Sequence, residues 1–526
     1  MAQDATHIPK VGAFVLETLT TGMYTNALDA LREYVQNSFD SIQNASRTKA
    51  LPRGAGRIDI TIDDKKKELK IRDNGLGIPA VDVLPRLINI GMSAKTIADS
   101  AGFRGIGRLA GIAYCQRLIF RTRAHGEREI HEVTFRCDDI RKSMSPAKLQ
   151  TEEVADVLLQ YTESKSQKTN HSDAFFEVTM HGIVSEEQIF LDWQRIEGYL
   201  AQVAPVKFDT NSFPRTGDIY SWLRGRSILL PEISLVIHAG AVRQEVFKPY
   251  RKLSYKTKQQ NLPINVKGIR FYPENATPES PFWLWYADTN LPGMFGDDSV
   301  GGFRLRKNNI ALGMDERMAE IFAEVSDSSA RFNSYFIGEI HVQHSGTIPN
   351  ARRDGFEDNT AWTGIRQELV TFARERSKEI RECSKDRNMA VEKVLRPVEK
   401  QIEEADRKRV IGFASKDERE SFGLALDKSL DRLKRAKSGE RSSEEASRLE
   451  DARKRLVQTR ETLDTVPFIA QKLNTSLDRK QRRIIAEILE LLHQVLDSDS
   501  FERARNAISS KYSLKAESPK ESANKR

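Results

Sequence analysis

The sequence predicts an α+β protein: helices and strands are mixed over roughly the first 360 residues, and a helical region follows. Apolar residues recur every three or four positions between residues 28 and 42, which is the pattern of one buried helix face. Residues 57–73 alternate apolar and polar side chains on both sides of the turn DDKKK, as a β-hairpin does. After about residue 360, Glu, Lys, Arg, Leu and Ala dominate and prolines become rare, which favours helices.

The chain of 526 residues is too long for one ordinary hydrophobic core. Changes in composition predict an N-terminal domain, a mixed α/β middle domain, a helical region and a disordered basic tail, with the bounds 1–200, 201–360, 361–510 and 511–526. Two interpretations of the helical region stay open. It is either a plain helical bundle or a coiled coil that dimerises or grips a partner, and no sustained heptad decides between them.

Composition and charge narrow the class of protein. The net charge of +8 is compatible with nucleic acid or acidic partners but does not require them. The three cysteines are widely spaced and form no CxxC pair, which argues against a disulfide framework or a zinc site. No apolar run is long enough to span a membrane, and the N-terminus does not resemble a signal peptide. We therefore expect a protein of the reducing cytoplasm with no membrane partner.

The predicted helix at 28–45 carries a second, polar stripe. Glu33, Asn37 and Asp40 are spaced by four and three residues, so they project within roughly 60° of one another at about 100° per residue. For a lone helix, a solvated face is the simplest interpretation. Two glycine-rich stretches downstream, IRDNGLGIP at 71–79 and AGFRGIGRLAG at 101–111, favour a binding face instead.

Both stretches place glycines where a ligand could approach the backbone. Asp73 ends a predicted strand and enters a turn that contains Gly75 and Gly77, residues that can take positive φ. In the second stretch, three glycines precede the apolar segment LAGIAYC, which we interpret as a helix: Gly102, Gly105 and Gly107. Backbone N–H groups at such a turn can bind an anion.

Taken together, these residue types suit an ATP site. Asn37 offers Mg²⁺ a neutral oxygen that does not repel phosphates, and Glu33, one turn away, can act as a base toward an attacking water. Asp73 can accept a hydrogen bond from the exocyclic amine of adenine, and the turn at 102–107 can bind the phosphates. The chain has no GxxxxGK[ST] sequence and no Rossmann fingerprint, which excludes a P-loop and argues against a dinucleotide-binding Rossmann site.

Three motifs in this order and spacing resemble the Bergerat ATP-binding fold of the GHKL superfamily: ExxxNxxD at Glu33, Asn37 and Asp40, DNGLG at 73–77, and GFRGIG at 102–107. The superfamily contains gyrase B subunits, heat-shock-ninety-type chaperones, histidine kinases, MutL proteins and MORC ATPases. The resemblance covers roughly residues 10–360 and implies an α/β-sandwich ATPase domain followed by a transducer-like domain. Glu33 and the lack of a phospho-accepting histidine helix before the motifs argue against the histidine-kinase branch, and we expect a protein of the heat-shock-ninety or MORC type.

The resemblance implies a role for each matching residue. Glu33 is the expected general base, Asn37 the magnesium ligand, and Asp73 the adenine-binding residue, with Gly77 lining that pocket. Residues 79–107 are expected to form a mobile lid that contains IGMSAK, which brings Ser93 and Lys95 within reach of the nucleotide. Asp40 is expected to support its neighbours rather than to touch the nucleotide.

In this superfamily, a basic residue of the transducer domain senses the γ-phosphate. The sequence offers Arg352 and Arg353 in IPNARRDGFE, and Lys307 in FRLRKNN. For each of the three, an ordinary surface charge is the alternative interpretation.

These implications add up to an ATP-operated machine. We expect a slow ATPase that uses ATP and Mg²⁺ and forms a homodimer whose N-terminal domains meet when ATP binds. The expected partner is either a client protein, as for a chaperone, or double-stranded DNA, as for a MORC-like clamp. The alternative is a non-catalytic scaffold in which ATP only switches binding.

Overall fold

The computed structural model divides the chain into two units, Met1–Ser377 and Lys378–Arg526. The described residues are 10–20, 22, 24, 26–92, 105–144, 152–213, 215–251, 254–256, 261–263, 266–289, 291, 293–295, 299–314, 316–413, 416–437, 443–466 and 477–512. The division falls within helix α9, Thr360–Asn388. The four domain ranges expected from composition remain predictions.

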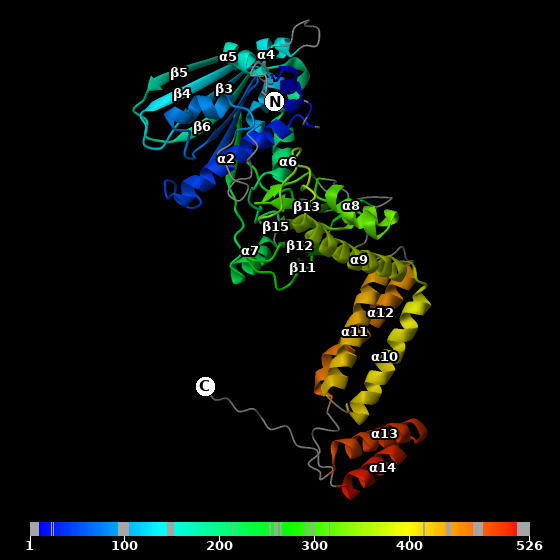
Figure 1. Cartoon of the computed structure of the whole chain (residues 1–526). Helices are drawn as coiled ribbons and strands as arrows, with labels where there is room; N and C mark the ends of the chain where they lie inside the picture. The colour runs from blue at the N-terminus through cyan, green and yellow to red at the C-terminus, as the bar shows by residue number, and fades with distance from the viewer. Residues whose placement is uncertain are drawn as a thin grey trace, which may run out of the picture. The chain divides into compact units, whose positions relative to one another are not determined.

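An eight-stranded sheet organises the first part of unit 1, with the strand order β5-β4-β3-β6-β2-β1-β7-β8 (Figure 1). Its strands are β1 Arg57–Asp63, β2 Glu68–Asp73, β3 Cys115–Arg123, β4 Glu129–Arg136, β5 Thr162–Lys168, β6 Phe175–Ile183, β7 Ser234–Ala239 and β8 Val242–Glu245. Neighbouring strands are antiparallel except β1 and β7, which run parallel. The sheet therefore takes in strands from beyond residue 200.

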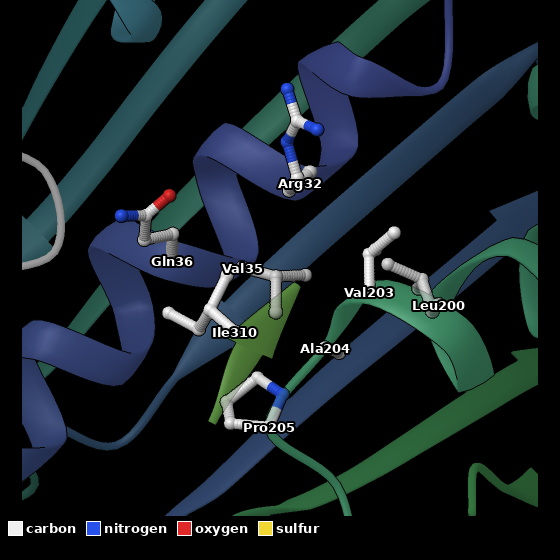
Figure 2. A pocket seen from close by; sticks show the side chains of 8 residues that line it. All are labelled: Arg32, Val35, Gln36, Leu200, Val203, Ala204, Pro205 and Ile310. Atoms are coloured by element: carbon white, nitrogen blue, oxygen red, sulfur yellow. The ribbon is translucent and has the colours of Figure 1, made fainter. Parts of the chain in front are cut away.

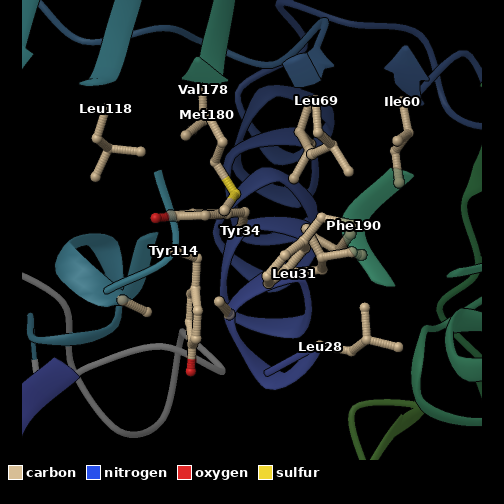
Figure 3. Packing of buried hydrophobic residues seen from close by; sticks show 14 of the residues in the cluster. Leu28, Leu31, Tyr34, Ile60, Leu69, Tyr114, Leu118, Val178, Met180 and Phe190 are labelled. Atoms are coloured by element: carbon tan, nitrogen blue, oxygen red, sulfur yellow. The ribbon is translucent and has the colours of Figure 1, made fainter. Parts of the chain in front are cut away.

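Helices bury the apolar face of this sheet. The central one is α2, Asp29–Arg47, whose Leu31 and Tyr34 share one apolar cluster with sheet residues such as Leu69 and Met180 (Figure 3). The other helices of this part are α1 Phe14–Thr20, η1 Ala80–Asp82, α3 Val83–Ile88, η2 Gly107–Ala113, α4 Cys137–Ser143, α5 Val154–Gln160, η3 Ser185–Leu191 and α6 Trp193–Val203.

Most of the expected elements in this part are confirmed. The helix at 28–45, the hairpin at 57–73 and the strands near 117, 130 and 175 match α2, β1–β2, β3, β4 and β6. The helix expected over LAGIAYC is instead a 3₁₀ helix at Gly107–Ala113, and strand β3 begins at Cys115.

A five-stranded sheet, β11-β12-β15-β13-β14, forms the second part of unit 1. Its strands are β11 Gly268–Tyr272, β12 Phe282–Asp288, β13 Gly302–Lys307, β14 Ile310–Ala311 and β15 Ile337–Val342, and the hairpin β9 Ser254–Lys256 with β10 Asn261–Pro263 lies outside it. The helices are α7 Thr216–Gly225, α8 Glu316–Val325 and η4 Asp327–Tyr335. The expected mixed α/β character is confirmed.

A buried ion cluster joins the strands of the second sheet. The carboxylate of Glu339 on β15 accepts hydrogen bonds from Lys248 Nζ at 2.8 Å and from Arg306 Nε at 2.7 Å. All three side chains are fully buried. Because breaking such a pair leaves an uncompensated buried charge, the cluster holds β13, which carries Arg306, against β15.

Unit 2 is helical. Its helices are α10 Val391–Ile411, α11 Lys416–Lys437, α12 Ser443–Thr462, η5 Leu463–Thr465, α13 Arg479–Val495 and α14 Ser498–Lys511. Residues of α10, α11 and α12 share one apolar core, so these helices form a bundle. A dimerising coiled coil remains a prediction, and most of the tail after residue 511 lies outside the described residues. Across the described helices of both units, none combines the length and apolar character needed to cross a bilayer.

Candidate functional site

The polar ridge of α2 is covered by other parts of the chain. Glu33 is 6 % exposed and Asp40 is 4 % exposed, while Asn37 is half-buried. The solvated-face interpretation is therefore wrong for Glu33 and Asp40. Charged side chains are rarely buried without a partner, so the Glu33 and Asp40 carboxylates are expected to contact other groups of the chain.

Asp73 is a buried carboxylate with spare hydrogen-bonding capacity. It ends β2 and is 2 % exposed. Its Oδ1 accepts a hydrogen bond from Gly75 N at 2.9 Å, and its Oδ2 has no hydrogen-bond partner among the described residues. Burial raises the pKa of Asp73 to about 7, against the lowering effects of the Gly75 N–H and the Ser38 hydroxyl. A buried acceptor without a donor is costly in a folded protein, so this atom points to a ligand donor.

The two glycines after Asp73 let the backbone lie so close to neighbouring elements that a side chain would not fit. Gly77 has φ +68°, and a Cβ there would lie 2.1 Å from the carbonyl oxygen of Arg123. A Cβ on Gly75 would lie 2.2 Å from Ser41 Oγ. The turn is thus pressed against β3 on one side and α2 on the other, which keeps Asp73 in place.

Sequence analysis did not single out Thr122, which lies on the same side of the sheet as Asp73. Phe176 of β6 is directly opposite both Asp73 of β2 and Thr122 of β3, so the three residues form one cross-strand row. The Thr122 hydroxyl accepts a hydrogen bond from Ile78 N at 2.9 Å and donates to Phe175 O at 3.0 Å. It therefore anchors the backbone that follows Gly77, and only the three-dimensional register reveals this.

The second glycine turn reaches the Glu33 carboxylate. A Cβ on Gly107 would lie 2.2 Å from Glu33 Oε2, so the glycine backbone is in contact with this side chain. Gly105 has φ +67°, a conformation that favours glycine. Ser93, Lys95 and Gly102 lie outside the described residues, so their predicted contacts with nucleotide remain predictions.

Arg353 faces Glu33 from the other side. Its Nε lies 2.6 Å from Glu33 Oε1, and both side chains are 8 % exposed. Arg353 has φ +55°, an unusual value for a non-glycine residue. Its backbone is held by hydrogen bonds from its own N–H to Asn350 O and from Gly313 N to its carbonyl oxygen. The chain thus maintains a strained backbone at the residue that pairs with Glu33.

The other two basic residues expected at this position lie differently. Arg352 is exposed, and its backbone carbonyl accepts a hydrogen bond from Arg32 Nη2 at 3.2 Å. Lys307 Nζ donates to His344 O at 2.6 Å and to Thr347 Oγ1 at 3.1 Å. Burial lowers the pKa of Lys307 to about 8. Of the three candidates, the structure brings Arg353 to Glu33.

A second polar network, which sequence analysis missed, supports this loop from α2. Arg32 Nη1 lies 3.4 Å from Asp29 Oδ1, and the same oxygen accepts a hydrogen bond from Tyr199 Oη at 2.5 Å. All three residues are at most 9 % exposed. The network connects α6, the first turns of α2 and the backbone of Arg352, so the loop that carries Arg353 is attached to the helix that carries Glu33.

An apolar seam lies on the neighbouring side of α2 (Figure 2). Val35 faces Leu200, Val203 and Pro205 at the end of α6, and Ile310 of β14 closes the seam. The space holds no room for a water molecule, so it is a packing interface rather than a ligand pocket. It places the tip of the second sheet directly against the helix that carries the site.

Magnesium fits this ridge together with a phosphate. Within the described ranges, no cluster of three or more His, Cys, Asp or Glu side chains is arranged to hold a metal ion. Asn37 offers one amide oxygen on the same ridge as Glu33. Mg²⁺ is commonly held by one or two protein oxygens plus phosphates and water, so one such donor suits magnesium bound to ATP rather than a free ion.

The matched part of the sequence agrees with this geometry. Residues 24–169 match the family described as histidine kinase-, DNA gyrase B-, and HSP90-like ATPase. The matched segment contains Glu33, Asn37, Asp73 and Gly107, whereas Arg353 lies beyond it in the sequence. The ion pair between Glu33 and Arg353 therefore joins the matched segment to a later part of the same unit.

No curated protein matches the chain. Among solved structures, the ATPase region of Saccharomyces cerevisiae topoisomerase II is similar with 12% identity and a TM-score of 0.36, over 67% of this chain and 85% of that one.

Proposed function

We propose that this protein is a slow ATPase in which Glu33 is the general base and nucleotide binding changes the conformation of unit 1. The observation that carries the proposal is the position of Glu33. Its buried carboxylate contacts the Gly107 backbone on one side and the Arg353 guanidinium on the other. A water that attacks a γ-phosphate needs a base within hydrogen-bonding distance, and Glu33 is the ridge carboxylate on which the described Gly107 packs.

Asp73 is the proposed recognition residue for adenine. A carboxylate oxygen accepts hydrogen bonds, and the exocyclic amine of adenine donates them. The buried Oδ2 of Asp73, which has no partner among the described residues, supports this role. The close approach of Gly77 to Arg123 supports a base pocket whose wall is backbone rather than side chain.

The phosphate end is proposed to lie between α2 and the second glycine turn. Asn37 binds Mg²⁺, which neutralises phosphate charge when it is bound. Gly105 and Gly107 would let the backbone approach the phosphates. The proposed nucleotide contacts of Gly102, Ser93 and Lys95 rest on the sequence motifs alone, because these residues lie outside the described ones.

Arg353 is the proposed γ-phosphate sensor. In this structure its guanidinium pairs with Glu33, which satisfies both buried charges. A γ-phosphate offers the guanidinium a stronger, bidentate acceptor. When Arg353 moves to the phosphate, the Glu33 carboxylate becomes able to accept the proton of the attacking water. The loop that carries Arg353 then moves with it, and this couples ATP to the second sheet.

The test is steady-state ATPase activity of the full chain and of its Glu33→Gln variant. Loss of a general base lowers turnover by about 10²–10⁴-fold. Nucleotide binding measured calorimetrically on the same samples has to persist in the variant. Equal phosphate release by the two proteins would overturn the role of Glu33.

The proposed assembly is a homodimer of the heat-shock-ninety or MORC type, which closes when ATP binds. Sedimentation velocity with a non-hydrolysable ATP analogue tests it, and a protein that stays monomeric contradicts it.

The proposed partner is a client protein or double-stranded DNA. Duplex binding that weakens steeply as salt rises favours DNA, and absence of duplex binding at low salt removes the DNA clamp.

A nucleotide-gated scaffold without hydrolysis is the second candidate function. It is favoured by the same ion pair, because Arg353 occupies the carboxylate that hydrolysis requires. Under this candidate, ATP binds and changes the oligomeric state, and phosphate release by the full chain is no faster than by Glu33→Gln.

A further inference from the structure

Tyr34 follows Glu33 on α2 and makes contacts that packing alone does not require. Its side chain is 2 % exposed and lies close to Leu118 and Met180 in the core beneath the sheet (Figure 3). Its hydroxyl accepts a hydrogen bond from Gly111 N at 2.8 Å and donates one to Arg108 O at 3.1 Å. A phenylalanine would fill the same space but could not make these two hydrogen bonds.

The two backbone groups that Tyr34 contacts belong to the turn that reaches Glu33. A Cβ on Gly111 would lie 2.5 Å from Tyr34 Oη, and a Cβ on Gly107 would lie 2.2 Å from Glu33 Oε2. Two successive residues of α2 thus contact the two ends of one short segment, residues 107–111. The separation between α2 and this segment is set at both ends.

Arg108 fixes the same segment to a third element. Its Nε donates to Leu87 O of α3 at 3.1 Å, while its own carbonyl oxygen accepts the hydrogen bond from Tyr34. Burial lowers the pKa of Arg108 to about 10. The segment is therefore held by side-chain hydrogen bonds from α2 and to α3, and the Tyr34 hydroxyl provides the α2 side.

We infer that Tyr34 is a positioning residue for ATP hydrolysis: its hydroxyl holds residues 108–111 so that the Gly107 backbone stays packed on the Glu33 carboxylate. This inference rests on the proposed function, because Glu33 has to be the base. Without the hydroxyl, the Gly111 N–H and the Arg108 carbonyl lose a buried partner, and the segment gains freedom to move away from α2. Glu33 then loses the wall that restricts its orientation, which slows the chemical step more than it weakens binding.

The test compares Tyr34→Phe with Tyr250→Phe in the full-length protein. Tyr250 is a matched control: it is 1 % exposed, and its hydroxyl donates to the buried Glu339 in the second sheet at 3.1 Å. We expect Tyr34→Phe to lower kcat by about 5–10-fold, the effect of one lost hydrogen bond, with KM for ATP within about twofold of wild type. Tyr250→Phe lowers the melting temperature and leaves kcat within about twofold.

Hydrogen exchange gives a readout that does not depend on activity. Amides of residues 105–114 exchange faster in Tyr34→Phe than in wild type, and they are unchanged in Tyr250→Phe. A wild-type kcat in Tyr34→Phe, or a fall in kcat matched by Tyr250→Phe, overturns the inference. If wild type and Glu33→Gln release phosphate equally, the proposed function fails instead, so the two failures are distinguishable.

Discussion

Arg353 Nε lies 2.6 Å from Glu33 Oε1, and both side chains are almost completely buried. The two residues are 320 positions apart in the sequence, and Arg353 comes from a loop beyond the matched ATPase segment. A buried charge pair of this kind costs desolvation and is strongly destabilising to break on one side only. The contact therefore ties the proposed base to the part of unit 1 that has to respond to nucleotide.

Energetic coupling between these two residues is the first prediction. In a double-mutant cycle with Glu33→Gln and Arg353→Gln, the free energy of unfolding should give a coupling of about 1–3 kcal/mol, because each single change strands a buried charge. Chemical denaturation of the four proteins measures it.

The matched control for this cycle is the ion pair between Lys10 and Glu153. Its atoms are 2.5 Å apart, but the side chains are 73% and 38% exposed. Solvent screening makes such a pair weaker than a buried one. If the buried pair couples no more strongly than the exposed one, the Glu33–Arg353 contact is not an organising feature of unit 1.

Removal of the Arg353 and Lys307 side-chain charges should have unequal effects. Arg353→Met should lower ATP turnover at least tenfold and reduce the preference for ATP over ADP, because the guanidinium is the group placed at Glu33. Lys307→Met should change turnover by less than about threefold, since its ammonium is bonded to His344 and Thr347. ATP turnover and the affinities for ATP and ADP are measured for both variants. A larger loss of turnover in Lys307→Met than in Arg353→Met would assign the γ-phosphate sensor to Lys307.

The raised pKa of Asp73 predicts a pH dependence of stability. Its ordinary value of 3.8 applies to the unfolded chain, and burial raises the folded value to about 7. Between about pH 4 and pH 7 the folded protein therefore binds a proton that the unfolded chain has lost, so stability falls as pH rises through this window. Relative to Asp73→Asn, wild type should lose roughly 4 kcal/mol across it. Denaturation at several pH values measures this difference, and a flat difference contradicts the shift.

Gly77 and Gly126 test the close approach beside Asp73. Both have positive φ, +68° and +84°, but a Cβ meets the Arg123 carbonyl at 2.1 Å in one case and open space in the other. Gly126→Ala should cost about 1 kcal/mol of stability from backbone strain alone. Gly77→Ala should cost several times more and weaken ATP binding, measured by calorimetry. Equal behaviour of the two variants would show that the turn is free to move off β3.

Local patterns anticipated much of the fold. The repeat of Leu28, Leu31 and Val35 predicted α2, and the alternation that ends at Asp73 predicted the β1–β2 hairpin, because both depend on neighbours in sequence. The parallel pairing of β1 with β7 was not predictable in this way. It joins strands more than 170 residues apart, and the local sequence of neither strand indicates which strand it pairs with.

The candidate site likewise contains residues that local motifs predict and residues that only long-range contacts identify. Glu33, Asn37, Asp73 and Gly107 were predicted because short motifs carry them. The sequence could not choose among Lys307, Arg352 and Arg353, because the answer depends on where a loop folds back onto α2. Tyr34 was missed because a tyrosine at an apolar helical position looks like core, and only its distances to Gly111 and Arg108 give it a second role.

Single-turnover phosphate release tests the central claim, that Glu33 activates water for ATP hydrolysis. Wild type and Glu33→Gln are each mixed with a small amount of γ-labelled ATP, and bound nucleotide and free phosphate are measured in the same samples. The account predicts that both proteins bind ATP and that the variant releases phosphate at least about 100-fold more slowly. Equal rates from equally loaded proteins would contradict it.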